Sequence, residues 1–129
     1  MNLQKEFVPY QEALELKELG FDEPCFGSWE TEHVKVPTYT HSISEFYTNS
    51  NHPRGKTTAP TYSQAFRWFR DNGYEAFPKK TENNEYYYTI EYGHWTFIMD
   101  DKYYSYEEAE LACLKQLIRM LKSNNDSRK

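Results

Sequence analysis

Two cysteines and four histidines are the residues of this chain with the clearest chemical potential. A cysteine hydrolase needs a thiolate, a histidine base and a carboxylate that orients the histidine. Cys113 lies on the apolar stripe of an expected helix, where a thiol is inert, and Cys25 follows an acidic run that disfavours a thiolate. We therefore predict two buried free thiols, and a hydrolase that uses Cys25 and His94 is the least favoured alternative. The residues considered for this set are Cys25, Cys113, His94, Asp100 and Asp101.

Metal and nucleotide sites are not predicted. The histidines lack a close metal-binding spacing such as HExxH, and a structural zinc needs four ligands. Gly55-Lys56-Thr57 resembles the end of a phosphate loop, but the glycine four residues earlier is missing. We interpret the acidic pairs Asp100-Asp101 and Glu107-Glu108 as a turn and a helix N-terminus. We therefore expect no catalytic residue, no metal and no cofactor. The histidines are His33, His41, His52 and His94.

A group of basic and aromatic residues is the strongest candidate for a binding site. Arg67 and Arg70 flank a tryptophan off the apolar stripe of an expected helix, and two lysines follow the next expected strand. Arginine and aromatic side chains anchor protein partners or stack on bases. The alternative is an amphipathic helix with solvated arginines and a half-buried tryptophan. The candidate contact residues are Arg67, Trp68, Arg70, Lys79, Lys80, Phe46 and Tyr47.

Composition and charge restrict the class of protein. The 129 residues suffice for one domain with a core, to which 12 tyrosines, 8 phenylalanines and 3 tryptophans contribute large apolar areas. The net charge is −5, and an acidic segment over residues 12–32 argues against broad affinity for nucleic acids. We find no apolar run of membrane-spanning length and no signal-peptide pattern, so we expect a cytoplasmic protein without a membrane contact.

Three helices are expected, and each begins with the pattern Tyr-x-x-Ala, at Tyr10, Tyr62 and Tyr106. The first begins at Pro9 and ends at Gly20, the second runs from about residue 61 to 72, and the third continues to about residue 122. Ser105 and Glu108 predict a capping box at the start of the third helix. We expect residues 123–129 to form a flexible polar tail.

Short strands are expected at residues 25–29, 33–36, 74–78, 85–91 and 94–99, with a polar loop over residues 38–60. A two-residue hairpin loop at Tyr92-Gly93 would place Ile90 opposite Trp95 and Tyr88 opposite Phe97. This register puts large apolar residues on one face, although tyrosine is unfavourable in so tight a turn.

These elements predict one α+β domain over residues 1–122, with three helices packed on a small, mostly antiparallel sheet. Its C-terminal half has the order α-β-β-β-α, which is similar to that of double-stranded RNA-binding domains. The acidic segment at residues 106–110 would repel phosphate, so the likeness does not extend to that binding mode.

Three sequence blocks carry a closer resemblance. LKELGFDEPCF at residues 16–26, APTYSQAFRWFR at residues 59–70 and YSYEEAELACLK at residues 104–115 look like blocks of a family of small uncharacterised proteins. That family is encoded by bacteriophages and prophages of gut bacteria, and the resemblance implies a bacterial host cytoplasm. It carries no functional residues over to this chain.

We expect a non-enzymatic protein-binding module that acts on a host or phage protein. The alternative is a nucleic-acid-binding module that uses a small basic-aromatic surface at Arg67, Arg70, Lys79 and Lys80. Such binding would weaken steeply with salt. Neither the oligomeric state nor the strand order follows from the sequence.

Overall fold

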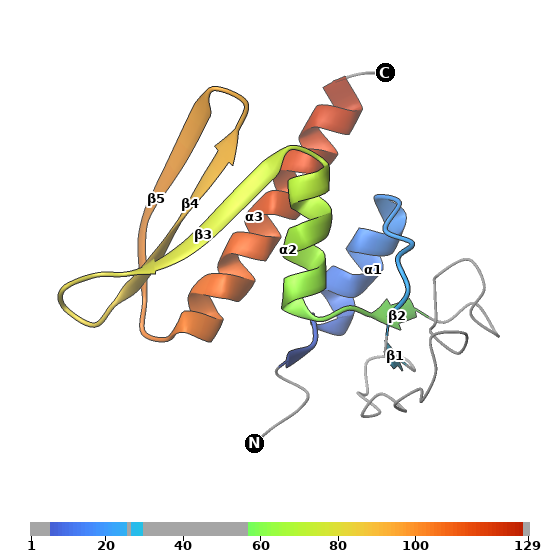
Figure 1. The fold of residues 1–129 in the computed structure, drawn as a ribbon, viewed down its shortest axis with the longest axis horizontal. Helices are drawn as coiled ribbons and strands as arrows, with labels where there is room; N and C mark the ends of the chain where they lie inside the picture. The colour runs from blue at the N-terminus through green and yellow to red at the C-terminus, as the bar shows by residue number, and fades with distance from the viewer. Residues whose placement is uncertain (1–5, 26, 30–56, 128–129) are drawn as a thin grey trace. The chain divides into compact units, whose positions relative to one another are not determined.

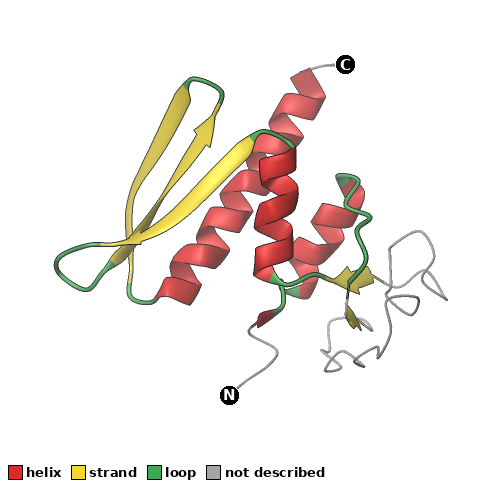
Figure 2. Ribbon diagram, viewed as in Figure 1, coloured by secondary structure: helices red, strands yellow, loops and turns green. Residues whose placement is uncertain are grey.

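The computed structural model describes residues 6–25, 27–29 and 57–127 (Figure 1). The described chain has the predicted α+β fold, with three helices and antiparallel strands in one two-stranded and one three-stranded sheet (Figure 2). Its contacts divide into two compact units, residues 1–65 and 66–129, and the boundary falls inside the second helix. The single domain expected over residues 1–122 stays a prediction.

The N-terminal unit contains helix α1 (Tyr10–Glu18) and strands β1 (Gly27–Trp29) and β2 (Thr57–Ala59). β1 pairs with β2 in antiparallel register. We expected residues 57–59 in the polar loop, and that prediction is wrong because pairing with β1 buries all three of them. Threonine suits a strand as well as a loop, so a polar composition misled the prediction. The expected strand at residues 33–36 lies outside the described residues.

Trp29 joins the elements of the N-terminal unit. Its side chain is 4% exposed, and its indole Nε1 donates a hydrogen bond of 3.1 Å to the carbonyl oxygen of Val8. The Val8 amide in turn donates to the carbonyl oxygen of Pro60 at 2.9 Å. Tyr10, the first residue of α1, meets the Trp29 ring edge-on at 6.4 Å between centroids. A buried indole with a satisfied N–H therefore fixes the start of α1 beside the small sheet.

All three helices begin at the tyrosine of a Tyr-x-x-Ala pattern, as predicted. Their alanines, Ala13, Ala65 and Ala109, are at most 2% exposed. Alanine has the highest helix propensity and no side-chain bulk beyond Cβ, so the first turn can approach its neighbours closely. In helix α2 (Tyr62–Asp71) the preceding turn also carries a capping box, in which Thr61 and Gln64 exchange hydrogen bonds of 3.1 and 3.2 Å.

The predicted glycine endings of the first two helices are confirmed. Gly20 and Gly73 have φ values of +103° and +94°, in the left-handed region that side chains disfavour. After α1, the Phe21 amide donates to the carbonyl oxygen of Leu16 at 2.9 Å. After α2, the rings of Phe69 and Tyr74 meet edge-on at 6.1 Å. Both endings therefore turn the chain by the same local mechanism.

The C-terminal unit contains strands β3 (Tyr74–Lys80), β4 (Tyr86–Tyr92) and β5 (Trp95–Tyr103) and helix α3 (Tyr106–Ser127). The strands form an antiparallel sheet in the order β3-β4-β5, so β4 is central and both β3 and β5 are edges. Helix α3 lies along one face of this sheet (Figure 1). We call that face the inner face and the opposite face the outer face.

The β4–β5 hairpin loop differs from the prediction. Tyr92 pairs with Trp95, so the loop is Gly93-His94, and Ile90 pairs with Phe97 instead of Trp95. Gly93 takes φ +61°, which the first loop position demands and tyrosine would resist. The shift is by two residues, so every side chain keeps the face assigned from the sequence.

A bulge interrupts β5 between Met99 and Tyr103, which oppose Tyr88 and Tyr86 of β4. We interpreted the acidic pair Asp100-Asp101 as a turn, and that prediction is wrong because both residues lie in the strand, within this bulge. The two extra residues leave Tyr103 on the inner face, where its ring stacks on Tyr88 at 6.3 Å.

The core of the C-terminal unit joins α3 to the inner face of β3 and β4. The apolar side of the helix is 0–1% exposed, and Ile90 of β4 is 0% exposed. The predicted Ser105–Glu108 cap is confirmed, with the Glu108 amide 3.2 Å from the Ser105 hydroxyl. α3 continues to Ser127, five residues beyond its expected end, and Asn124 in this extension donates a hydrogen bond to the Tyr74 hydroxyl. The buried residues of α3 are Ala109, Cys113, Leu114, Leu117 and Ile118.

Replacing Leu117 by alanine tests this core. Leu117 is fully buried, so Leu117→Ala should lower the free energy of unfolding by roughly 2–5 kcal/mol through lost burial and a residual cavity. Lys115→Ala in the same helix is the matched control because Lys115 is exposed, and its effect should stay within about 0.5 kcal/mol. Urea unfolding followed by circular dichroism measures both. Equal losses in the two variants would contradict this packing of α3.

Candidate functional site

The predicted basic-aromatic residues do not gather on one surface. Arg67 and Arg70 are exposed on α2, and Trp68 is half-buried with its ring edge-on to Phe69 at 5.1 Å. Lys79 and Lys80 are exposed at the far end of β3, which leads away from the end of α2 (Figure 1). Seven strand residues span about 20 Å, so the lysines are remote from Arg70. Phe46 and Tyr47 lie outside the described residues.

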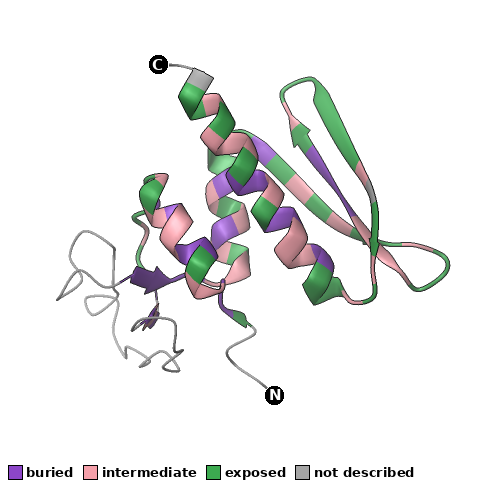
Figure 3. Ribbon diagram, turned by 180° about the vertical axis from the view of Figure 1, so that it is seen from behind, coloured by how far each residue is buried: buried purple, intermediate pink, exposed green. Residues whose placement is uncertain are grey.

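The first half of β5 is poorly covered. Trp95 and Ile98 are 70% and 64% exposed, and Phe97 is 38% exposed. No described side chain of β5 is buried, and Figure 3 shows most of the strand as exposed. From Trp95 to Met99 the strand carries no charge. An uncharged apolar edge that pairs with β4 alone among the described strands is a ready template for pairing with another strand.

The opposite edge of the sheet is built differently. β3 carries Pro78, which has no N–H to offer, followed by Lys79 and Lys80. Proline and lysine on an edge strand are typical of edges protected against pairing. Further along β5, the bulge with Asp101 and Lys102 interrupts the regular strand. The unprotected edge is therefore limited to residues 95–99.

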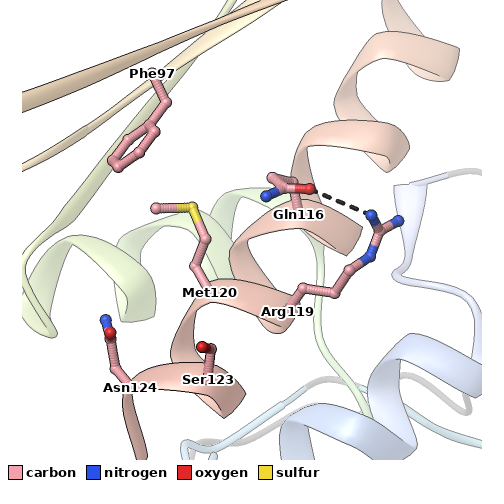
Figure 4. Close-up of a pocket in the computed structure, with 6 residues that line it drawn as sticks. All are labelled: Phe97, Gln116, Arg119, Met120, Ser123 and Asn124. Carbon is pink, nitrogen blue, oxygen red and sulfur yellow. Dashed lines mark hydrogen bonds between the residues drawn. The ribbon is translucent and has the colours of Figure 1, made fainter. Parts of the chain in front are cut away.

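A groove lies between this edge and the C-terminal half of α3. It has a volume of about 310 Å³, and Phe97 points into it from β5 toward Met120 of the helix (Figure 4). Its rim is polar, and Arg119 donates a hydrogen bond of 3.3 Å to the side-chain oxygen of Gln116. The groove is lined by Phe97, Gln116, Arg119, Met120, Ser123 and Asn124.

The electrostatic character of this region is set by basic residues of α3. Arg119 is exposed at the groove. Its positive charge lowers the pKa of Tyr88 and Tyr103 on the inner face and so partly offsets the increase that burial causes. Burial raises the pKa of Tyr88 to about 12, and its neighbour Tyr103 contributes to the increase. Lys122 lies on the same half of the helix as Arg119, and Lys115 lies one turn before Arg119. The groove therefore combines an apolar floor with a cationic rim, and it suits an apolar side chain next to a carboxylate.

The two thiols are poorly suited to nucleophilic catalysis. Burial raises the pKa of both Cys25 and Cys113 to about 12, so each remains protonated near neutral pH. The Cys25 thiol donates to the carbonyl oxygen of Glu23 at 3.3 Å, and a nearby carboxylate, that of Glu110, raises the pKa of Cys113 further. His94 is exposed in the hairpin loop, whereas Cys113 is buried in α3.

Within residues 6–25, 27–29 and 57–127, no three histidine, cysteine, aspartate or glutamate side chains form a metal-binding group. None of the helices described here is long and apolar enough to cross a bilayer.

Sequence reasoning missed the β5 edge as a site. We predicted residues 94–99 as a strand with one apolar face. The sequence also puts a large apolar residue, Ile98, on the opposite face, and this feature could have indicated the site. A large apolar side chain on both faces of one strand is unusual in a sheet that is covered on one side only.

The buried thiols should resist labelling. We expect Cys25 and Cys113 to react slowly with a soluble disulfide reagent at roughly pH 8, and both to react rapidly once the chain is unfolded in denaturant. Lys115→Cys supplies an exposed thiol in the same helix, and this control should react fast in the folded protein. Stoichiometric fast labelling of a native cysteine would contradict its burial.

The same groups predict a loss of stability in alkali. The folded pKa of each thiol, about 12, exceeds its ordinary value of 9.0. Their contribution is therefore complete below pH 9 and is lost as the pH rises toward 12, because the unfolded thiols ionise first. Urea midpoints measured across this range should fall less steeply in Cys113→Ala than in the wild type.

Comparison with known proteins offers no relative from which a function could be transferred: no protein-family model, no curated protein and no solved structure matches the chain.

Proposed function

We propose that this protein is a non-enzymatic binding module that takes up an extended segment of a partner protein along residues 95–99 of β5. The observation that carries the proposal is the uncharged edge at which Trp95 is 70% and Ile98 64% exposed. A segment added to a sheet edge gains backbone hydrogen bonds, and pockets for alternate side chains supply specificity. The groove beside Phe97 provides such a pocket.

The chemistry of the groove defines the partner. Apolar side chains at alternate positions of the segment would lie over Phe97 and Met120, and the Trp95 ring would cover its end. The exposed Arg119 favours a carboxylate on the same segment, because opposite charges at an interface steer association and fix register. The partner is therefore an extended protein segment that combines apolar residues with at least one acidic residue.

The biological setting comes from the resemblance to phage and prophage proteins. On that basis we place the partner among host or phage proteins in the bacterial cytoplasm. A nucleic-acid partner is less favoured, because Arg67 and Arg70 lie on α2, apart from Lys79 and Lys80 at the far end of β3, and the net charge of the chain is −5.

Selection from a displayed library of random linear peptides tests the proposed site with the full chain. The enriched peptides should share apolar residues at alternate positions and an acidic residue. Trp95→Ser should weaken their binding at least about tenfold, because exposed aromatic anchors dominate such interfaces. Tyr104→Ser is the matched control, since Tyr104 is 86% exposed and lies outside β5, and it should bind like the wild type.

A charge reversal separates the groove from non-specific adhesion to an apolar surface. The Arg119→Glu variant should no longer bind the acidic peptides, and a new selection with this variant should enrich basic peptides. Peptides that bind Trp95→Ser and Arg119→Glu as well as the wild type would overturn the proposed site.

A further inference from the structure

The outer face of the three-stranded sheet carries a second pattern, which shares Ile98 with the β5 edge. Strand register places its side chains in three rows across the sheet. The middle row is Phe77, Thr89 and Ile98, of which Phe77 is 39% and Ile98 64% exposed. No helix of the C-terminal unit packs over this row, because α3 lies on the inner face. An exposed apolar row on a sheet face marks a surface that another chain can cover.

The rows on either side of the middle row carry opposite charges. Toward the β4–β5 loop, Glu75 of β3 lies directly opposite Glu91 of β4. Toward the other end, Lys79 lies opposite Tyr87, and the Lys102 ammonium sits 4.9 Å from the centre of the Tyr87 ring. The outer face therefore runs from an acidic row through an apolar row to a basic row.

The acidic row lowers the stability of the C-terminal unit, and no described residue of that unit compensates for this loss. Like charges directly opposite each other on neighbouring strands are destabilising. Neither Glu75 nor Glu91 forms an ion pair with another described residue. At the basic end, the Lys79 and Lys102 ammonium groups lie over the rings of Phe77 and Tyr87, at 5.9 and 4.9 Å from the ring centres. Among the described residues, Glu75 and Glu91 therefore have no counter-charge, and the two lysines contact aromatic rings.

We propose that this face binds a second copy of the same chain. The two copies are related by a rotation of 180° about an axis that runs along the middle row. Their outer faces then meet, and the strands of one copy run opposite to those of the other. Glu75 then faces Lys79 of the second copy, and Glu91 faces Tyr87 of the second copy with the Lys102 ammonium beside it. The middle rows meet, so Phe77 packs on Phe77 and Ile98 on Ile98. Two-fold symmetry forms every Glu–Lys pair twice.

An alternative dimer, in which the copies are related by a rotation of 180° about the strand direction, is disfavoured. It lays β3 over β5 and brings Lys79 of one copy onto Lys102 of the other. Like charges across an interface reject a wrong orientation. The order of charges along the sheet therefore selects the orientation in which acidic and basic rows meet.

The size of the face sets the strength of the dimer. Three strands about 4.8 Å apart and about 20 Å long give a footprint of roughly 300 Å² per copy, below the ~800 Å² of a standard interface. The dimer is therefore reversible, with a dissociation constant in the range of roughly micromolar to millimolar. Its formation should weaken as salt is added, because the ion pairs lie near the rim.

Sedimentation velocity of the full chain, from about 1 μM to about 1 mM, tests the dimer with a charge exchange. Glu75→Lys and Lys79→Glu should each weaken association roughly tenfold, because each variant places like charges opposite each other twice. The double variant Glu75→Lys/Lys79→Glu restores the opposite pairs across the two-fold axis, and it should associate within about threefold of the wild type. The two residues are four positions apart on one strand, so recovery cannot come from a new contact within one chain.

Further variants decide which surface is used. Phe77→Ser should weaken the dimer, whereas Trp95→Ser, which alters the peptide site at the β5 edge, should leave it unchanged. A wild type that stays monomeric up to about 1 mM would overturn the proposal, as would a double variant no better than the single ones. A dimer lost in Trp95→Ser and kept in Phe77→Ser would also overturn it, because the β5 edge would then be the contact.

Discussion

The packing of α3 on the inner face of β3 and β4 is the interaction on which the C-terminal unit depends. One helix is about 10 Å wide, and strands lie about 4.8 Å apart, so a single helix covers about two strands. Leu114, Leu117 and Ile118 are buried by this contact together with Ile90 of the central strand. The third strand, β5, therefore lies at the margin of the helix, and most of its described side chains remain exposed.

This geometric limit explains why the two edges of the sheet differ in character. β3 is adjacent to the turn after α2 and carries Pro78 and two lysines, which discourage pairing. β5 has no such protection over residues 95–99, and the gap between it and α3 is the groove that Phe97 enters. Trp95 is 70% exposed there, and a large exposed aromatic ring on an unprotected edge is typical of an interaction surface.

The edge and the outer face are two surfaces of one small sheet with different chemistry. The edge offers unpaired backbone, an apolar groove and the positive charge of Arg119. The outer face offers an apolar row between acidic and basic rows, a pattern that complements itself after a half-turn. Ile98 is the one residue of the apolar row that lies on β5 itself. A self-associating scaffold would therefore present two β5 edges, and two linked sites bind a divalent partner more strongly than either alone.

The sequence by itself determined the three helices with their tyrosine starts, the glycine ends of the first two, the α+β class and the faces of residues 86–91 and 95–99. These features follow from local rules, such as capping, left-handed glycine and period-two alternation, which act within a few residues. It did not determine that residues 57–59 pair with β1, that the hairpin loop is Gly93-His94, or that Lys79 lies far from Arg70. Only tertiary structure decided which strand lies at the edge and which face a single helix leaves uncovered, because both depend on the spatial order of elements distant in the chain.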